Sequence, residues 1–237
     1  MVLLNTLDKI PFKKNRCYRL IPSKFPPVPL FEDVASEADF ADLYAIQALT
    51  NPRIQDEMGN LSLVRPEERV YAIPGSGYVM AAFTHINPNG SRFSNGDYGV
   101  YYASETLDAA IAETVYHREQ FLQFTKEPAQ TIEMRTLSAE FSAELYNLLP
   151  FDRDHHALYS LTDYRLGQEL GAEIKRQNEA GLMYYSVRVE KERTARNFAL
   201  FKPNCIHQCK QTSHYIYQWD GSKISAVYKK TRVLALG

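Results

Sequence analysis

Five polar side chains that are far apart in the chain stand in local patterns that suit ligand binding or catalysis. Arg19 ends a short apolar run, and Arg92 lies in a loop of Gly, Ser and Asn residues whose backbone N–H groups are free. Tyr102 lies in an aromatic run, and Ser186 in an apolar, aromatic one, both typical of strands. Glu113 borders the apolar face of an amphipathic helix, where a carboxylate needs a partner. Taken singly, each of the five has an ordinary structural explanation.

A second group of residues has the chemistry of metal ligands. Cys205, His207 and Cys209 would share one face of a strand, and His214 could complete a set of four ligands. The spacing Cys-x-His-x-Cys matches no common zinc pattern, so a half-buried strand with unreactive thiols is favoured and no metal is expected. Cys17 stands alone and is interpreted as structural.

Two further clusters have simpler interpretations. Residues Asp152 to His156 combine two carboxylates with two imidazoles, but neighbouring side chains point in different directions, which favours an exposed loop. Glu113 and His117 lie one helical turn apart without the second histidine of a metalloprotease motif. A hydrogen bond across that turn is the favoured interpretation.

Composition excludes several classes of protein. The 237 residues include 27 Lys and Arg and 28 Asp and Glu, so no excess of positive charge indicates direct nucleic-acid binding. No run of 18 or more apolar residues indicates a membrane span, and the basic residues follow the apolar ones at the N-terminus, the reverse of a secretory signal. Three cysteines form no disulfide framework, so we expect a soluble protein of the cytoplasm.

The first half of the chain predicts helices and one strand. A helix over Glu37–Leu49 is capped by Ser36, and a shorter one follows Asn51-Pro52 and ends at Gly59. The segment 87–99 is a loop, 100–103 a strand, and the helix that follows, capped by Thr106, is the clearest in the chain. The loop over 87–99 and the N-terminus of the helix capped by Thr106 are expected to lie on the same side.

The second half predicts a strand over 131–137, a helix from a Thr162 cap to Asn178, a strand after Gly181, and a hairpin. Asp220-Gly221 suits a type I′ turn in that hairpin. The predicted strands are concentrated in the second half of the chain, and they do not alternate regularly with helices as in a βαβ series. The fold class expected is therefore α+β, with a mixed or mainly antiparallel sheet flanked by helices, as a single domain over 1–237 with a helical insertion at 31–74.

Taken together, the runs YRL, GSRF, YYAS, DAAIAE and QELGAEIKRQNEAGLMYYSVR, followed by NFALF, resemble the RES domain, the toxin family named after its Arg, Glu and Ser residues. The resemblance covers about two thirds of the chain plus the N-terminal arginine motif, and it rests on the order and spacing of the runs. It implies that Arg19, Glu113 and Ser186 are the signature residues. Arg92 and Tyr102 match further positions that line the family's pocket.

The resemblance also implies a fold similar to ADP-ribosyltransferases and the degradation of NAD⁺, which would be a substrate and not a cofactor. RES toxins are usually paired with an Xre-type antitoxin that blocks the active site. This sequence departs from compact members in the long stretch between Arg19 and Arg92, which leaves open an effector neutralised by an immunity protein.

The chemistry of NAD⁺ cleavage suits these residues. Nicotinamide leaves as a neutral group, so the main requirement is to stabilise positive charge on the ribose, which Glu113 would do. Arg19 and Arg92 would bind the diphosphate and adjoining ribose, and Tyr102 would stack on nicotinamide. Ser186 would hydrogen-bond a ribose hydroxyl or the carboxamide, and no neighbouring histidine supports it as a nucleophile.

Three functions are compatible with the sequence. ADP-ribose could pass to water or phosphate, or to a protein, or the chain could be a binding module without enzymatic activity. Protein-modifying transferases often carry a second acidic residue two positions before the catalytic glutamate. Ile111 occupies that position here, which favours water or phosphate as the acceptor.

Overall fold

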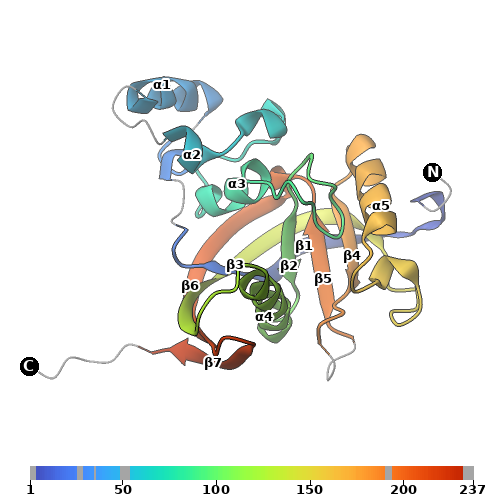
Figure 1. Cartoon of the computed structure of the whole chain (residues 1–237). Helices are drawn as coiled ribbons and strands as arrows, with labels where there is room; N and C mark the ends of the chain where they lie inside the picture. Colours follow the sequence, from blue (N-terminus) through green and yellow to red (C-terminus); the bar gives the residue numbers. More distant parts are fainter. Residues whose placement is uncertain (1–3, 26–28, 35, 49–53, 190–193, 232–237) are drawn as a thin grey trace, which may run out of the picture.

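The computed structural model describes residues 4–25, 29–34, 36–48, 54–189 and 194–231, and Figure 1 shows their arrangement. The strands are β1 Lys9–Pro22, β2 Tyr101–Ser104, β3 Gln130–Asn147, β4 Gly181–Tyr185, β5 Arg196–Leu200, β6 Ile206–Trp219 and β7 Ile224–Lys230. The helices are α1 Glu37–Ala48, α2 Ile54–Met58, α3 Ser76–Thr84, α4 Leu107–Phe124 and α5 Arg165–Arg176. Short 3₁₀ helices span Leu4–Thr6, Pro29–Phe31, Leu61–Leu63, Pro66–Glu68, Ala157–Tyr159 and Pro203–Cys205.

The strands form one seven-stranded sheet in the order β1-β2-β5-β4-β3-β6-β7. Strand β1 also pairs along its length with β3, so the first five strands of this order close into a ring. The pairing of β3 with β4 is parallel and the others are antiparallel. The expected α+β class with a mixed, mainly antiparallel sheet is confirmed.

The long strand β3 forms the centre of the sheet. The sequence predicted a strand over 131–137, but β3 continues to Asn147 because β1 and β6 pair with it on its two sides. Its side chains Leu137, Phe141 and Leu145 are fully buried, in the alternation expected of a half-buried strand. Pairing partners that are remote in the sequence therefore set the length of this strand.

Helix α4 forms as the sequence predicted and lies against the sheet (Figure 1). The hydroxyl of Thr106 caps it by accepting a hydrogen bond from the N–H of Ala109, at 3.3 Å. Its buried Ala110 contributes to a core cluster with Leu20, Met134, Tyr215 and Tyr217, so α4 is fixed against β1 and the β3–β6 pair. The same packing positions Glu113, which lies three residues after Ala110 and so on a neighbouring part of the helix surface.

The described part of the segment 31–74 holds α1, α2 and short 3₁₀ helices joined by irregular stretches, and it covers the upper side of the molecule with α3 in Figure 1. Ser36 caps α1 by accepting a hydrogen bond from the N–H of Asp39, at 3.2 Å, as predicted. Phe31 and Phe40 stack with ring centroids 5.1 Å apart and belong to the main core cluster. The predicted helix start at Asn51-Pro52 lies outside the described residues.

Two local predictions were wrong. The first is the Thr162 cap. Helix α5 forms within the predicted 162–178, but it begins at Arg165 and ends at Arg176, because the carboxylate of Asp163 accepts a hydrogen bond from the N–H of Arg165 at 3.0 Å and forms a turn before the helix.

The second is the turn of the β6–β7 hairpin, which has a loop over 220–223 and not a two-residue type I′ turn. The Asp220 carboxylate holds this loop by accepting hydrogen bonds from the N–H groups of Ser222 and Lys223.

None of the described helices has both the length and the apolar character that crossing a bilayer requires.

Glycines on α5 allow the loop that carries Arg92 to pack directly on the helix. A Cβ at Gly171 would lie 2.0 Å from the carbonyl oxygen of Phe93, and a Cβ at Gly167 would lie 2.4 Å from that of Arg92. Backbone atoms cannot move aside as a flexible side chain would. The two glycines therefore set the position of this loop.

We expect Gly171→Ala to lower the free energy of unfolding by about 1 to 3 kcal/mol, because the added methyl group displaces the loop backbone. Urea denaturation measures the change. Glu169→Ala, at an exposed position of the same helix, is the control and should stay within about 0.5 kcal/mol of the unmodified protein. Equal stability of Gly171→Ala and the control would contradict the close packing.

Candidate active site

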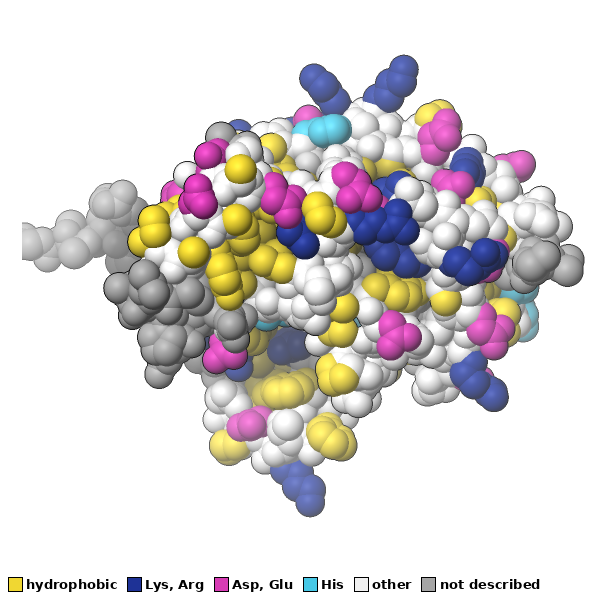
Figure 2. Space-filling view, turned by 90° about the horizontal axis from the view of Figure 1, so that it is seen from above, with side chains coloured by type: hydrophobic (Ala, Val, Ile, Leu, Met, Phe, Trp, Pro, Cys, Tyr) yellow, Lys and Arg dark blue, Asp and Glu magenta, His cyan; other side chains and the backbone are white. Residues whose placement is uncertain are grey.

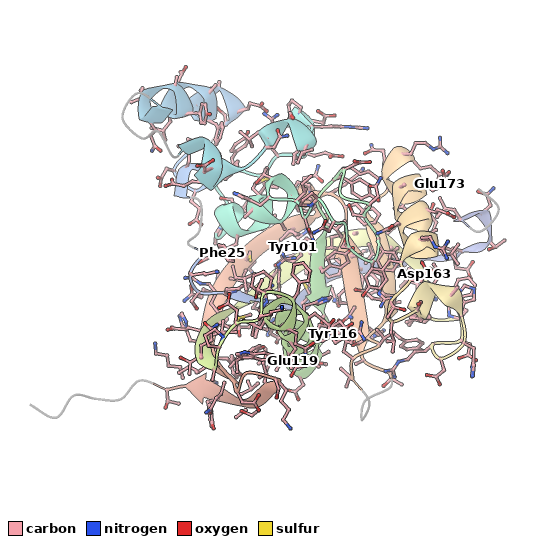
Figure 3. All side chains as sticks on the ribbon, in the orientation of Figure 1. Phe25, Tyr101, Tyr116, Glu119, Asp163 and Glu173 are labelled. Carbon is pink, nitrogen blue, oxygen red and sulfur yellow. The ribbon has the colours of Figure 1, made fainter. Side chains whose placement is uncertain are left out.

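A cavity of about 600 Å³ lies between α4, the edge of the closed sheet and the loop before β2. Arg19, Arg92, Tyr102 and Glu113 all line it, so the structure brings four of the five dispersed residues together. In Figure 3, Tyr116 and Glu119 mark α4 in front of the sheet, Tyr101 marks β2, and Asp163 and Glu173 lie on the α5 side. The remaining lining residues are Tyr18, Leu20, Asn87, Gly90, Ser91, Ala103, Ser104, Ala110, Thr114, Tyr116, His117, Arg118, Gln120, Phe121, Tyr164, Tyr184, Arg188 and Asn197.

The carboxylate of Glu113 is held by two buried donors. The hydroxyl of Ser186 donates to Glu113 Oε1 at 2.6 Å, and Asn197 Nδ2 donates to the same oxygen at 2.7 Å. Ser186 is 0% exposed and Asn197 2% exposed. No described residue donates to Oε2. The half-buried carboxylate is thus fixed through one oxygen and presents the other to the cavity.

A third buried side chain extends this network. The hydroxyl of Ser104 donates to Asn197 Oδ1 at 2.7 Å, which orients the amide so that its N–H₂ group faces Glu113. Ser104 and Asn197 are register partners in the β2–β5 ladder, and side chains of such partners project from the same face. The pairing of β2 with β5 therefore builds the site for Glu113.

Ser186 lies beneath Glu113 and does not line the cavity. Its N–H donates to the carbonyl of Ala195 at 2.8 Å, which continues the β4–β5 ladder one residue beyond the end of β4. Its hydroxyl accepts a hydrogen bond from the N–H of Arg188 at 3.3 Å while it donates to Glu113. In this structure the hydroxyl supports the carboxylate, whereas the sequence predicted that it would bind a ribose hydroxyl or carboxamide.

Arg19 and Tyr102 are neighbours on adjacent strands. Arg19 Nη1 donates to the carbonyl oxygen of Tyr102 at 3.2 Å, and the guanidinium lies 5.0 Å from the ring centroid of Tyr101. The Tyr102 hydroxyl shares a hydrogen bond of 2.7 Å with Ser91 and accepts one of 3.0 Å from the N–H of Phe93. Desolvation raises the pKa of Tyr102 to about 12, so the hydroxyl stays neutral and can anchor the loop of Arg92.

Arg92 is fixed from the opposite wall. Its Nη1 donates to the carbonyl oxygens of Leu158 and Ser160, each at 2.9 Å. The guanidinium also lies over the ring of Tyr164, 4.7 Å from its centroid. Both bonds use one nitrogen, so the other N–H groups are available to a ligand in the cavity.

The predicted hydrogen bond between Glu113 and His117 is absent from the described structure. Glu113 turns toward Asn197 and Ser186 on the strands, while His117 contacts the ring of Tyr116 edge to face, with centroids 5.3 Å apart. Glu113 is therefore bound by Asn197 and Ser186 and not by His117, the partner expected one turn along the helix.

Sequence reasoning assigned no role to Asn197 or Ser104. Asn197 follows Arg196 in an apolar run, where a polar residue is a weak signal of a buried contact. Only the register of two strands about 90 residues apart reveals its partners. No pattern in the sequence predicts that register.

The candidate metal ligands do not share a face. Cys209 is buried while His207 is exposed, because the β3–β6 register shifts between Glu140 and Phe141 and breaks the alternation. Cys205 lies in a 3₁₀ helix before the strand. Within the described ranges no three residues of the kinds that bind metals are grouped.

The segment 152–156 forms exposed turns, as predicted. His155 Nδ1 lies 2.9 Å from Asp152 Oδ2, and both side chains are more than half exposed.

Comparison with known proteins identifies relatives of this chain. Residues 69–220 match the model of the RES domain. The uncharacterized protein y4oC of Sinorhizobium fredii (strain NBRC 101917 / NGR234) is 31% identical over 215 residues, which cover 91% of this chain and 87% of that protein. A chain in the crystal structure of the M. tuberculosis MbcT-MbcA toxin-antitoxin complex is 9% identical with a TM-score of 0.45, over 91% of this chain and 87% of that one.

Asn197→Ala should lower the free energy of unfolding by about 1 to 3 kcal/mol, because Ser104 loses its acceptor and Glu113 a donor in a buried place. Thermal and urea denaturation test this expectation. Asn204→Ala is the matched control, since Asn204 is exposed and makes a single long hydrogen bond to the carbonyl of Glu67 at 3.4 Å. If the two variants are equally stable, the network does not hold the site together.

Proposed function

Because the chain belongs to the RES domain family, we propose that it is a toxin enzyme that degrades NAD⁺ by cleaving the bond between nicotinamide and ribose. One observation carries the proposal: the Glu113 carboxylate is fixed by two buried donors in a cavity whose lining includes four arginines and several aromatic rings. Such a cavity suits a ligand with phosphates, aromatic bases and one cationic centre.

Glu113 supplies the main catalytic effect. Cleavage leaves positive charge on the ribose, and nicotinamide departs as a neutral group without needing an acid. A carboxylate about 4 Å away at an effective dielectric near 20 stabilises that charge by roughly 4 kcal/mol, almost a thousandfold in rate. Because Ser186 and Asn197 hold the carboxylate in place before the reaction, little energy is spent on reorienting it.

The arginines and Tyr102 bind and orient NAD⁺. Arg19 and Arg92 extend from opposite walls and keep N–H groups for the diphosphate oxygens. The ring of Tyr102 lines the cavity and offers a face to nicotinamide. The reaction needs no cofactor, since NAD⁺ is itself the substrate.

Ser186 serves as a positioning residue in this proposal. Its hydroxyl is fully buried and donates its proton to Glu113, so it is not free to attack a substrate. Removing it would leave Glu113 with one buried donor where it now has two.

Water or phosphate is the acceptor that fits best. Ile111, two positions before Glu113, packs against the core cluster beneath α4. The position at which protein-modifying transferases often carry a second acidic residue is thus occupied here by an apolar side chain that packs against the core. Transfer of labelled ADP-ribose to protein would favour the transferase alternative, and the absence of both NAD⁺ loss and labelling would favour a binding module.

As a toxin, the protein should stop growth of the cell that produces it. An Xre-type antitoxin, or an immunity protein if the chain is a delivered effector, would then neutralise it in the cytoplasm. Growth arrest on induced expression, relieved by the same substitution that stops NAD⁺ loss, tests the toxin role directly.

Glu113→Gln should reduce NAD⁺ loss by about a hundred- to a thousandfold, because the amide keeps the shape of the carboxylate without its charge. Release of nicotinamide from the purified protein, with and without phosphate, measures it. Glu169→Gln on α5 removes an exposed charge that does not line the cavity and should retain full activity. Near-full activity of Glu113→Gln would show that the catalytic assignment is wrong.

Arg19→Ala should act mainly on binding. We expect about a ten- to hundredfold rise in KM for NAD⁺ with a smaller change in kcat, because the guanidinium is assigned to the diphosphate and not to the reacting bond. Arg16→Ala, an exposed residue of the same strand that does not line the cavity, is the control. A lower kcat with unchanged KM would place Arg19 at the reacting sugar instead.

A further inference from the structure

The cavity carries more positive charge than the proposed contacts to one diphosphate use. Its described lining includes Arg19, Arg92, Arg118 and Arg188, with Glu113 as the single acidic residue. The exterior differs, since basic and acidic side chains alternate over the face seen in Figure 2. The concentration of guanidiniums is thus a property of the cavity that this face does not share.

Arg118 differs from the other three arginines in its contacts. Arg19, Arg92 and Arg188 each donate to at least one backbone carbonyl. Arg118 has no hydrogen bond and no carboxylate partner among the described residues. Its guanidinium carbon lies 5.3 Å from the ring centroid of Phe121.

The position of Arg118 makes an unpaired guanidinium costly. The residue is half-buried on α4, and desolvation lowers its pKa although the nearby Tyr217 opposes the shift. A guanidinium has five N–H donors, and a partly desolvated one without acceptors gains strongly from a bound anion. Phe121 beside it is 46% exposed, so an aromatic ring accompanies the cation at the cavity wall.

We propose that Arg118 and Phe121 form a phosphate-binding subsite on the α4 wall, separate from Arg19 and Arg92. The inference deepens the proposed function and rests on it. Arg118 lies five positions after Glu113, about 7.5 Å along the helix axis, so the bound phosphate lies away from the reacting sugar. The group bound there is a phosphate of the dinucleotide, either its diphosphate or the 2′-phosphate that distinguishes NADP⁺ from NAD⁺.

The test measures binding in a protein that does not turn over. In the Glu113→Gln background, calorimetry gives Kd for NAD⁺ and for NADP⁺, with and without Arg118→Gln. We expect Arg118→Gln to weaken binding of at least one dinucleotide by about ten- to hundredfold. Arg118→Lys keeps the charge and should recover part of the loss, whereas Arg16→Gln removes an exposed charge outside the cavity and should change neither Kd.

The pattern of losses identifies the phosphate. An equal loss for both dinucleotides assigns Arg118 to the diphosphate, and a loss confined to NADP⁺ assigns it to the 2′-phosphate. Unchanged Kd values for both overturn the subsite while leaving the proposed function intact. Failure of the Glu113→Gln protein to bind either dinucleotide overturns the proposed function, and the subsite with it.

Discussion

A single carboxylate and its two buried donors determine the organisation of this protein's cavity. Glu113 lies on a helix, while its donors come from a strand, Asn197, and from the residue after another strand, Ser186. Leaving a charge or an amide unpaired in a buried place costs several times what an ordinary hydrogen bond contributes. Helix and strands must therefore keep their relative positions for the network to stay satisfied, and the walls of the cavity are positioned with them.

The closed part of the sheet provides that rigidity. Strand β1 pairs with both β2 and β3, so Arg19 is placed beside the strand that holds Tyr102 and Ser104. The loop with Arg92 is held twice, by the Tyr102 hydroxyl and by the glycine face of α5. Groups that must act on one ligand are thus fixed by elements that also pack into the core, as preorganised sites require.

Local sequence signals predicted the elements well and their ends less well. The caps at Ser36 and Thr106 were read correctly because a cap involves only neighbouring residues. The length of β3 was not predicted, because pairing with distant strands extends it. The burial pattern around Cys209 was not predicted either, because a shift in the β3–β6 register breaks the alternation of buried and exposed residues. The likeness to the RES family supplied Arg19, Arg92, Tyr102, Glu113 and Ser186, but not Asn197, Ser104 or Arg118.

The sequence by itself determined which chemical groups the candidate site has: the carboxylate of Glu113 on a helix, several arginines, and aromatic residues. Local patterns also placed each of them on a helix, a strand or a loop. Only the tertiary structure decided that Ser186 supports Glu113, that Ser104 and Asn197 complete the network, and that Arg118 lines the cavity without a hydrogen-bond partner among the described residues. The physical reason is the separation along the sequence over which each interaction acts. Capping and periodicity act over a few residues, whereas strand register and the pairing of buried polar groups join segments about 80 residues apart.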